Sequence, residues 1–104
     1  MFTLDDLARV IDERAQAGAD VSYTSSLLAK GAAHCAKKFG EEALELAIAV
    51  VAQDESAVRA EAADVVYHLL VALRSRGVAF AEVVGELERR SGRSGLEEKA
   101  SRRG

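Results

Sequence analysis

Apolar residues recur every three or four positions along most of the chain, and no segment alternates strictly between apolar and polar residues. The first spacing is typical of amphipathic helices, whereas strict alternation would indicate strands. No proline interrupts the pattern. Four long helices are therefore predicted, at about residues 4–17, 32–53, 57–76 and 79–90, with a short helical turn around Leu27 and Leu28 before the second.

Polar residues that can cap a helix precede several of these segments. Thr3 stands before the first helix, either Ser22 or Thr24 before the short turn, and either Asp54 or Ser56 before the third long helix. A side-chain oxygen at such a position accepts a hydrogen bond from a free N–H of the first turn. Glycines are expected to mark the ends of three segments. They are Gly18, Gly31 and Gly77.

The predicted fold class is all-α, a bundle of four to five helices. Many core positions hold alanine or valine, and a domain near this size buries only about 60–65% of its unfolded surface. Leu44, Ile48 and Val51 share one face of the second long helix. On the third, Val66 and Leu70 widen the apolar stripe beyond what one neighbour can bury. We therefore expect a homodimer joined along these two helices.

The composition is that of a folded protein with a single domain. The chain has 104 residues, of which 49% are hydrophobic and 30% charged, which is too apolar for a disordered chain. No run of about 18 uncharged apolar residues is present, so we expect no membrane-spanning helix. The first residues lack the pattern of a signal peptide, and Cys35 is the one cysteine. We expect a cytoplasmic protein.

Charge is unevenly distributed along the chain, whose net charge is −3. Residues 1–88 carry 8 Lys and Arg against 15 Asp and Glu, whereas residues 89–104 carry 6 against 2. The acidic body argues against a nucleic-acid-binding surface, which would need clustered cations. We expect one domain over residues 1–90 and a basic tail over residues 91–104, either a frayed, solubilising end or a contact for an anionic ligand.

Five carboxylates form the most informative pattern in the sequence. Glu41, Glu42 and Glu45 fall within an arc of about 100° on the second long helix. Glu61 and Asp64, three positions apart on the third long helix, also share a face. Folding the two helices antiparallel about the turn after Asp54 brings Glu45 level with Asp64, and Glu61 one turn nearer the connection. The two acidic groups are therefore predicted to face each other.

Acids packed together without counter-charge repel one another strongly where water is scarce. A divalent cation would relieve the repulsion, and carboxylate oxygens without His or Cys ligands suit Mg²⁺ or Mn²⁺. Bound Mg²⁺ is usually completed by substrate phosphates, so the pattern favours phosphate chemistry. The alternative is that each acidic string is a solvated helix face.

These strings resemble the signature of the all-α nucleoside-triphosphate pyrophosphohydrolases, the superfamily of the MazG-type and dimeric dUTPase enzymes. That signature is EE-x2-E, here followed after 15 residues by E-x2-D. Further strings are similar to those of one family within it, the phosphoribosyl-ATP pyrophosphatases, over about residues 3–90. They are Ser22-Tyr23-Thr24, Leu27-Leu28, Gly31, Lys38, Gly40-Glu41-Glu42-Ala43, Glu61-Ala62-Ala63-Asp64 and Tyr67-His68-Leu69-Leu70.

The resemblance implies Mg²⁺-dependent cleavage of phosphoribosyl-ATP to phosphoribosyl-AMP and pyrophosphate, the second step of histidine biosynthesis. It implies that the five acids bind metal or orient the attacking water. Glu41 or Glu42 would accept the proton of the water, and Glu42, Glu45, Glu61 and Asp64 would hold the metal. The chain lacks the cyclohydrolase domain of fused versions, so a separate phosphoribosyl-AMP cyclohydrolase is implied.

Three lysines are candidates for phosphate contacts, Lys30, Lys37 and Lys38. Lys37 and Lys38 stand one turn before the first acids, so helix salt bridges are an equal alternative. His34 and Lys37 occupy positions where the resemblance would place Lys and Gln. The charge near the phosphates is therefore expected to be arranged differently from that of the family.

Two further positions offer contacts to a nucleotide. Tyr23 and Thr24 are candidates for contacts to the base or ribose, with a packing aromatic and a helix cap as the alternative. His68 follows Asp64 by four residues on the same face, which indicates a histidine that orients the carboxylate rather than a metal ligand.

Three other functions are open on the sequence. One is a house-cleaning pyrophosphohydrolase acting on dUTP, dCTP or non-standard triphosphates, with the same acids. Another is a di-iron bundle, which would use Glu-x-x-His pairs, and Glu61 is followed at that spacing by Asp64 instead. The third is a non-catalytic helical dimerisation module with solvated acids.

Overall fold

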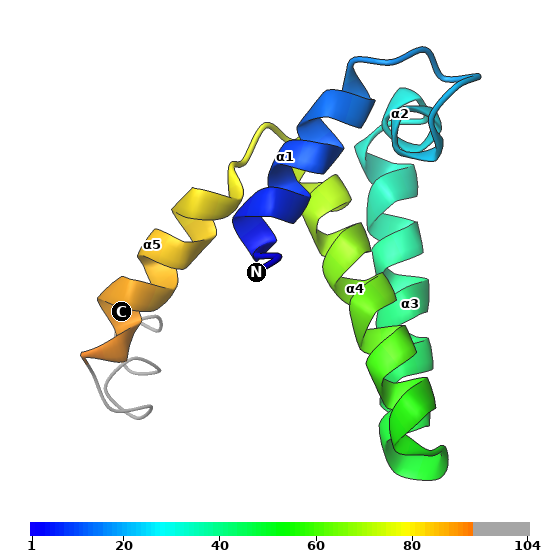
Figure 1. Cartoon of the computed structure of the whole chain (residues 1–104), viewed down its shortest axis with the longest axis vertical. Coiled ribbons are helices and arrows are strands. Elements are labelled where there is room, and N and C mark those ends of the chain that lie inside the picture. The colour runs from blue at the N-terminus through cyan, green and yellow to red at the C-terminus, as the bar shows by residue number, and fades with distance from the viewer. Residues whose placement is uncertain (93–104) are drawn as a thin grey trace.

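The computed structural model describes residues 1–92, and these form five α-helices without any strand (Figure 1). The all-α prediction is confirmed for this part of the chain. The helices are α1 (Leu4–Ala15), α2 (Tyr23–Ala29), α3 (Ala32–Ala52), α4 (Glu55–Ser75) and α5 (Phe80–Ser91). Most of the predicted basic tail, residues 93–104, lies outside the described residues.

Capping hydrogen bonds fix where three of the helices begin. The Thr3 hydroxyl accepts from a backbone N–H of α1 at 3.1 Å, as predicted. Ser22, not Thr24, caps α2, and Asp54, not Ser56, caps α4. Each accepts a hydrogen bond from the backbone N–H three residues further on, at 3.2 Å and 2.9 Å respectively.

Two glycines allow the chain to change direction between helices. Gly31 joins α2 to α3 with φ of +94°, and Gly77 follows α4 with φ of +71°. Both values lie in the left-handed region, which residues with a Cβ adopt at a cost. Gly18 does not itself end α1, because the helix stops at Ala15 and Gly18 accepts the hydrogen bonds of the following turn.

The long helices α3 and α4 form an antiparallel hairpin joined by Gln53 and Asp54 (Figure 1). They lie side by side along their whole length, and this is the most extensive helix pairing in residues 1–92. Helices α1 and α2 pack against the end of the hairpin far from its turn, so the turn projects away from the other helices. This arrangement leaves the two acidic strings facing each other in the hairpin.

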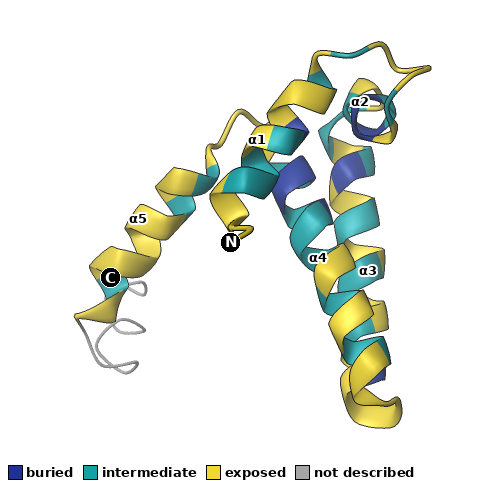
Figure 2. Cartoon of the chain, in the orientation of Figure 1, coloured by how far each residue is buried: buried dark blue, intermediate teal, exposed yellow. Residues whose placement is uncertain are grey.

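The core lies where α1 and α2 meet the hairpin (Figure 2). Its buried members are Ile11, Leu27, Cys35, Leu70 and Val71. Leu70, expected to exceed what one neighbouring helix can bury, is buried within the single chain because α1 and α2 bring Ile11 and Leu27 into the same cluster, so it does not require a partner subunit. Cys35 is buried, and its thiol donates to the carbonyl oxygen of Leu27 at 3.3 Å.

One face of α3 stays exposed and apolar in the single chain. We call it the α3 apolar face, and it consists of Leu44, Ile48 and Val51. Their exposed fractions run from 49% for Ile48 to 87% for Val51. An exposed apolar helix face is typical of a protein–protein contact.

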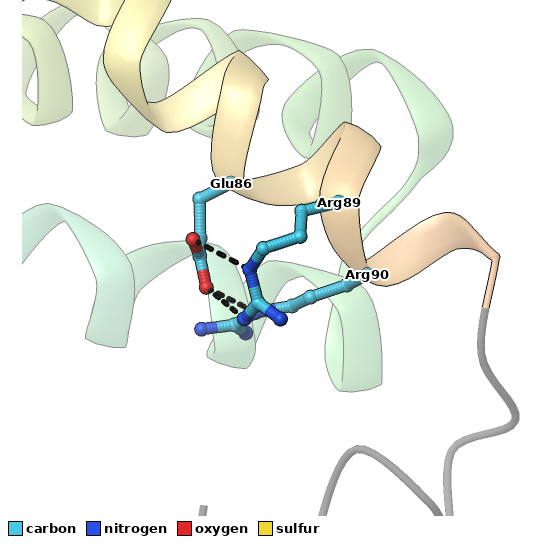
Figure 3. A network of polar contacts seen from close by, with 3 residues as sticks. All are labelled: Glu86, Arg89 and Arg90. Carbon is cyan, nitrogen blue, oxygen red and sulfur yellow. Dashed lines mark hydrogen bonds and ion pairs between the residues drawn. The ribbon is translucent and has the colours of Figure 1, made fainter. Parts of the chain in front are cut away.

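Helix α5 extends away from the hairpin and ends in a charged network (Figure 3). The Glu86 carboxylate accepts hydrogen bonds from Arg89 at 2.6 Å and from Arg90 at 3.1 Å. These two guanidinium groups lower the pKa of Glu86 to about 2. Among the helices of residues 1–92, none combines the length and apolar character that crossing a membrane requires.

Candidate active site

Three carboxylates come together across the α3–α4 hairpin. Oxygen atoms of Glu42 and Glu45 on α3 and of Glu61 on α4 all lie within 4.8 Å of one another. The two acidic strings therefore meet, as the antiparallel arrangement predicted. The predicted partner of Glu45 was Asp64, but Glu45 joins Glu61, one turn nearer the connection, and the charge of Asp64 acts on Glu42 and Glu61.

Glu61 has the least favourable surroundings of the group. Its Oε2 atom is buried and has no hydrogen-bond partner among the described residues. Burial raises the pKa of Glu61, and the negative charges of Glu45 and Asp64 raise it further. A buried carboxylate oxygen without a donor, next to other carboxylates, lacks the positive charge that would offset it. The residues present therefore fit a hard cation.

The two adjacent glutamates that could act as a base differ in their surroundings. Burial raises the pKa of Glu42, and the charges of Glu45 and Asp64 add to the effect while Lys38 opposes it. Glu41 is exposed instead, and its Oε1 lies 3.7 Å from Nζ of Lys38. Only Glu42 of this pair belongs to the three-carboxylate cluster.

A cavity of about 870 Å³ opens beside the cluster, and Glu42 and Asp64 line it. The end of α1, the segment 17–22, the start of α2 and the middle of α4 form its other walls. Small-molecule sites commonly have volumes of about 300–1,000 Å³. The cavity is thus large enough for a nucleotide with its phosphates next to the acids.

Aromatic side chains form one part of the cavity lining. The rings of Tyr23 and Tyr67 are nearly parallel, with an interplanar angle of 15° and centroids 6.3 Å apart. His68 stands edge-on to both, and its centroid lies 5.1 Å from that of Tyr67. The hydroxyl groups of Thr24 and Tyr67 are 2.5 Å apart and share a hydrogen bond. Flat aromatic surfaces of this kind suit a nucleobase.

His68 is buried, with only 6% of its surface exposed. Burial lowers the pKa of His68, the charge of Lys38 lowers it further, and Asp64 acts in the opposite direction. The imidazole is therefore neutral at pH 7. No hydrogen bond joins His68 to Asp64 within residues 1–92, so the expected orienting contact to this carboxylate is not made there.

The three candidate lysines take different places. Lys38 lies beside Glu41, close enough to affect the pKa of both Glu42 and His68. Lys30 and Lys37 are exposed, and none of the three lysines lines the cavity.

Among the cavity-lining residues to which the sequence analysis gave no role are Glu13, Arg14 and Tyr67. Arg14 is the one cationic side chain in the cavity lining formed by the described residues. Glu13 and Arg14 reach the cavity because α1 ends beside α2, which no local pattern indicates. Tyr67 stands in one of the strings that resemble the family, and its aromatic ring beside His68 was the signal for a contact to the base.

The comparisons with known proteins agree with this geometry. The family model described as phosphoribosyl-ATP pyrophosphohydrolase matches residues 4–91, which include every candidate site residue. The chain is 57% identical to phosphoribosyl-ATP pyrophosphatase 1 of Bradyrhizobium diazoefficiens, covering 98% of this chain and 96% of that protein. It is 56% identical to phosphoribosyl-ATP pyrophosphatase 1 of Rhodopseudomonas palustris (98% and 95%). It is 50% identical to phosphoribosyl-ATP pyrophosphatase of Agrobacterium fabrum (97% and 94%).

Proposed function

Because the chain belongs to the phosphoribosyl-ATP pyrophosphohydrolase family, we propose that it hydrolyses phosphoribosyl-ATP to phosphoribosyl-AMP and pyrophosphate. This is the second step of histidine biosynthesis. The observation that carries the proposal is 57% identity over 98% of the chain to a protein named for this activity. The carboxylate cluster beside a nucleotide-sized cavity supports it chemically.

We assign the metal site to Glu42, Glu45, Glu61 and Asp64, with Mg²⁺ as the expected ion and Mn²⁺ as a substitute. The unpartnered Oε2 of Glu61 and the proximity of the three clustered acids support this assignment. When bound, such a cation neutralises phosphate charge as the phosphoanhydride bond breaks. The four carboxylates would hold the cation, and Glu42 and Asp64 are the two of them that line the cavity.

Glu42 is the proposed proton acceptor for the attacking water. A general base must lie within reach of the proton that it accepts, and Glu42 belongs to the three-carboxylate cluster that would hold the cation. Glu42 also lines the cavity, where the water and the phosphate meet. Glu41 is the alternative base, but it is exposed and paired with Lys38.

The remaining site residues bind and orient the nucleotide. Tyr23 offers an aromatic face to the base, and Thr24, bonded to Tyr67, holds the neighbouring ring in place. Lys38 is the lysine that we assign to the phosphates, because its charge reaches Glu42. None of the three lysines lines the cavity, but only Lys38 acts on a residue that does. Neutral His68 fixes the aromatic wall beside Asp64.

A homodimer is part of the proposal, joined along α3 and α4 through the α3 apolar face. The product, phosphoribosyl-AMP, would pass to a separate phosphoribosyl-AMP cyclohydrolase. A cytoplasmic location fits the free, buried thiol of Cys35. The proposed catalytic domain comprises residues 1–90, and the basic tail over residues 91–104 lies outside it.

The test is pyrophosphate release from phosphoribosyl-ATP, with and without Mg²⁺, compared with ATP, dUTP and dCTP. We expect Mg²⁺-dependent release from phosphoribosyl-ATP in strong preference to the others. Release from dUTP or dCTP alone would move the protein to nucleotide clearance. A lack of release from all four, together with a melting temperature indifferent to Mg²⁺, would leave a non-catalytic helical module.

A further inference from the structure

Among the described residues, three acidic side chains and one cationic side chain line the cavity, and Glu13 and Arg14 are neighbours on α1. Glu42 and Asp64 line it from α3 and α4, whereas Arg14 lines it from the last turn of α1. A divalent cation held by the acids would account for only the triphosphate part of a ligand. The presence of Arg14 in the same cavity calls for a separate anionic group.

Arg14 also lacks an ion-pair partner within residues 1–92, although two other arginines nearby have one. Arg9, on the same helix, pairs with Asp6, and Arg74 of α4 pairs with Asp12 at 3.3 Å. An arginine guanidinium is a strong, bidentate donor to phosphate oxygens. A cavity-lining guanidinium without a carboxylate partner is therefore suited to an anionic ligand.

The proposed substrate, phosphoribosyl-ATP, carries two separate anionic groups. One is the triphosphate of its ATP part, and the other is the phosphate of its added ribosyl group. The carboxylate cluster cannot serve the second phosphate directly, because like charges repel. Hydroxyl groups of the added ribose would be donors suited to Glu13, which lines the cavity beside Arg14.

We propose that Arg14 binds the phosphate of the phosphoribosyl group and is thereby the residue that distinguishes phosphoribosyl-ATP from ATP. This inference rests on the proposed function and deepens it. Arg14 is a binding residue remote from the bond that breaks. Its loss should therefore raise KM for phosphoribosyl-ATP more than it lowers kcat.

The first experiment measures steady-state kinetics of the full chain with Arg14→Met, Arg14→Lys and the control Arg9→Met. Methionine has a helix propensity close to that of arginine and an unbranched apolar side chain without the guanidinium group. Arg9 does not line this cavity. We expect R14M to lower kcat/KM for phosphoribosyl-ATP by about 10- to 100-fold, as for a lost charged hydrogen bond. R14K should lower kcat/KM less than R14M does, because lysine keeps the positive charge. R9M should behave as wild type.

A binding experiment separates this inference from the proposed function. Affinities for phosphoribosyl-AMP and AMP, measured by calorimetry without metal, differ only through the phosphoribosyl group. Wild type and R9M should prefer phosphoribosyl-AMP, and R14M should lose that preference by about 10-fold or more. A preference kept by R14M, or an equal loss for AMP, would overturn the assignment of Arg14. Failure of wild type to release pyrophosphate from phosphoribosyl-ATP would instead overturn the proposed function.

Discussion

Truncation of Ile48 on the α3 apolar face should weaken the proposed dimer by an amount that follows from its exposure. The side chain is 49% exposed in the single chain. Burying an isoleucine completely is worth about 1.5–3 kcal/mol, so covering the exposed half contributes about 1 kcal/mol. A two-fold interface contains the residue twice. Ile48→Ala should therefore cost about 2 kcal/mol, or roughly 30-fold in the dimer dissociation constant.

Ile48→Asp is the stronger version of the same change. It removes the apolar contact and leaves an unpaired charge in each half of the interface, which costs several kcal/mol more. We expect this variant to be monomeric at concentrations where wild type is dimeric.

Sedimentation velocity over a dilution series measures both variants. Val84→Ala is the matched control, because Val84 is 43% exposed but lies on α5, away from the hairpin. It should dimerise as wild type does. A monomeric wild-type protein, or an I48D variant with the wild-type dissociation constant, would refute the reasoning about this face.

Three further predictions concern the site. In the first, Mg²⁺ at about 100 times its dissociation constant should stabilise wild type by about 2.7 kcal/mol. Glu61→Gln should abolish this stabilisation by Mg²⁺ in thermal unfolding. It should also stabilise the metal-free protein at pH 7, because the ionisation of a carboxyl whose pKa is raised in the folded state opposes folding. An E61Q variant still stabilised by Mg²⁺ would contradict the metal site. In the second, Glu42→Gln should lower kcat by about 10²-fold or more, while Glu41→Gln keeps most of it; the reverse order would assign the base to Glu41. The third prediction follows from the lowered pKa of His68: as pH falls, the unfolded chain binds a proton at this residue before the folded chain does. The contribution of His68 to folding stability is therefore full above about pH 6.5 and declines as pH falls below that value. Urea unfolding of wild type and His68→Gln at about pH 7 and about pH 5 should therefore show a smaller loss in the variant, and equal losses would contradict the neutral imidazole.

Local patterns predicted the helices well because their signals lie within a few residues. The spacing of apolar residues located α3 and α4, and Thr3 had no competing cap. The choice of Ser22 over Thr24 was open, since both side chains can cap a helix. Thr24 instead bonds to Tyr67, 43 residues away, and that contact exists only in the folded chain.

Contacts between helices that are distant in the sequence could not be predicted from local patterns. The pattern on α4 predicts that Leu70 needs more than one neighbour, but nothing in that helix shows that Ile11 of α1 is among them. Arg14 was missed for the same reason, since its place in the cavity depends on where α1 ends relative to α2. The acidic cluster was predicted in advance because it lies on two helices joined by a two-residue connection.

That short connection has a consequence for how the protein folds. Contacts between neighbouring helices joined by a tight turn close only a small loop, and such local contacts form early and fast. The repelling carboxylates Glu42, Glu45 and Glu61 lie across this same hairpin. Their repulsion is thus expected to act in the folding transition state, before α1 covers the core. Divalent cations should then accelerate refolding as well as slow unfolding. The Mg²⁺ proposed for catalysis would in this way also assist the assembly of its own site.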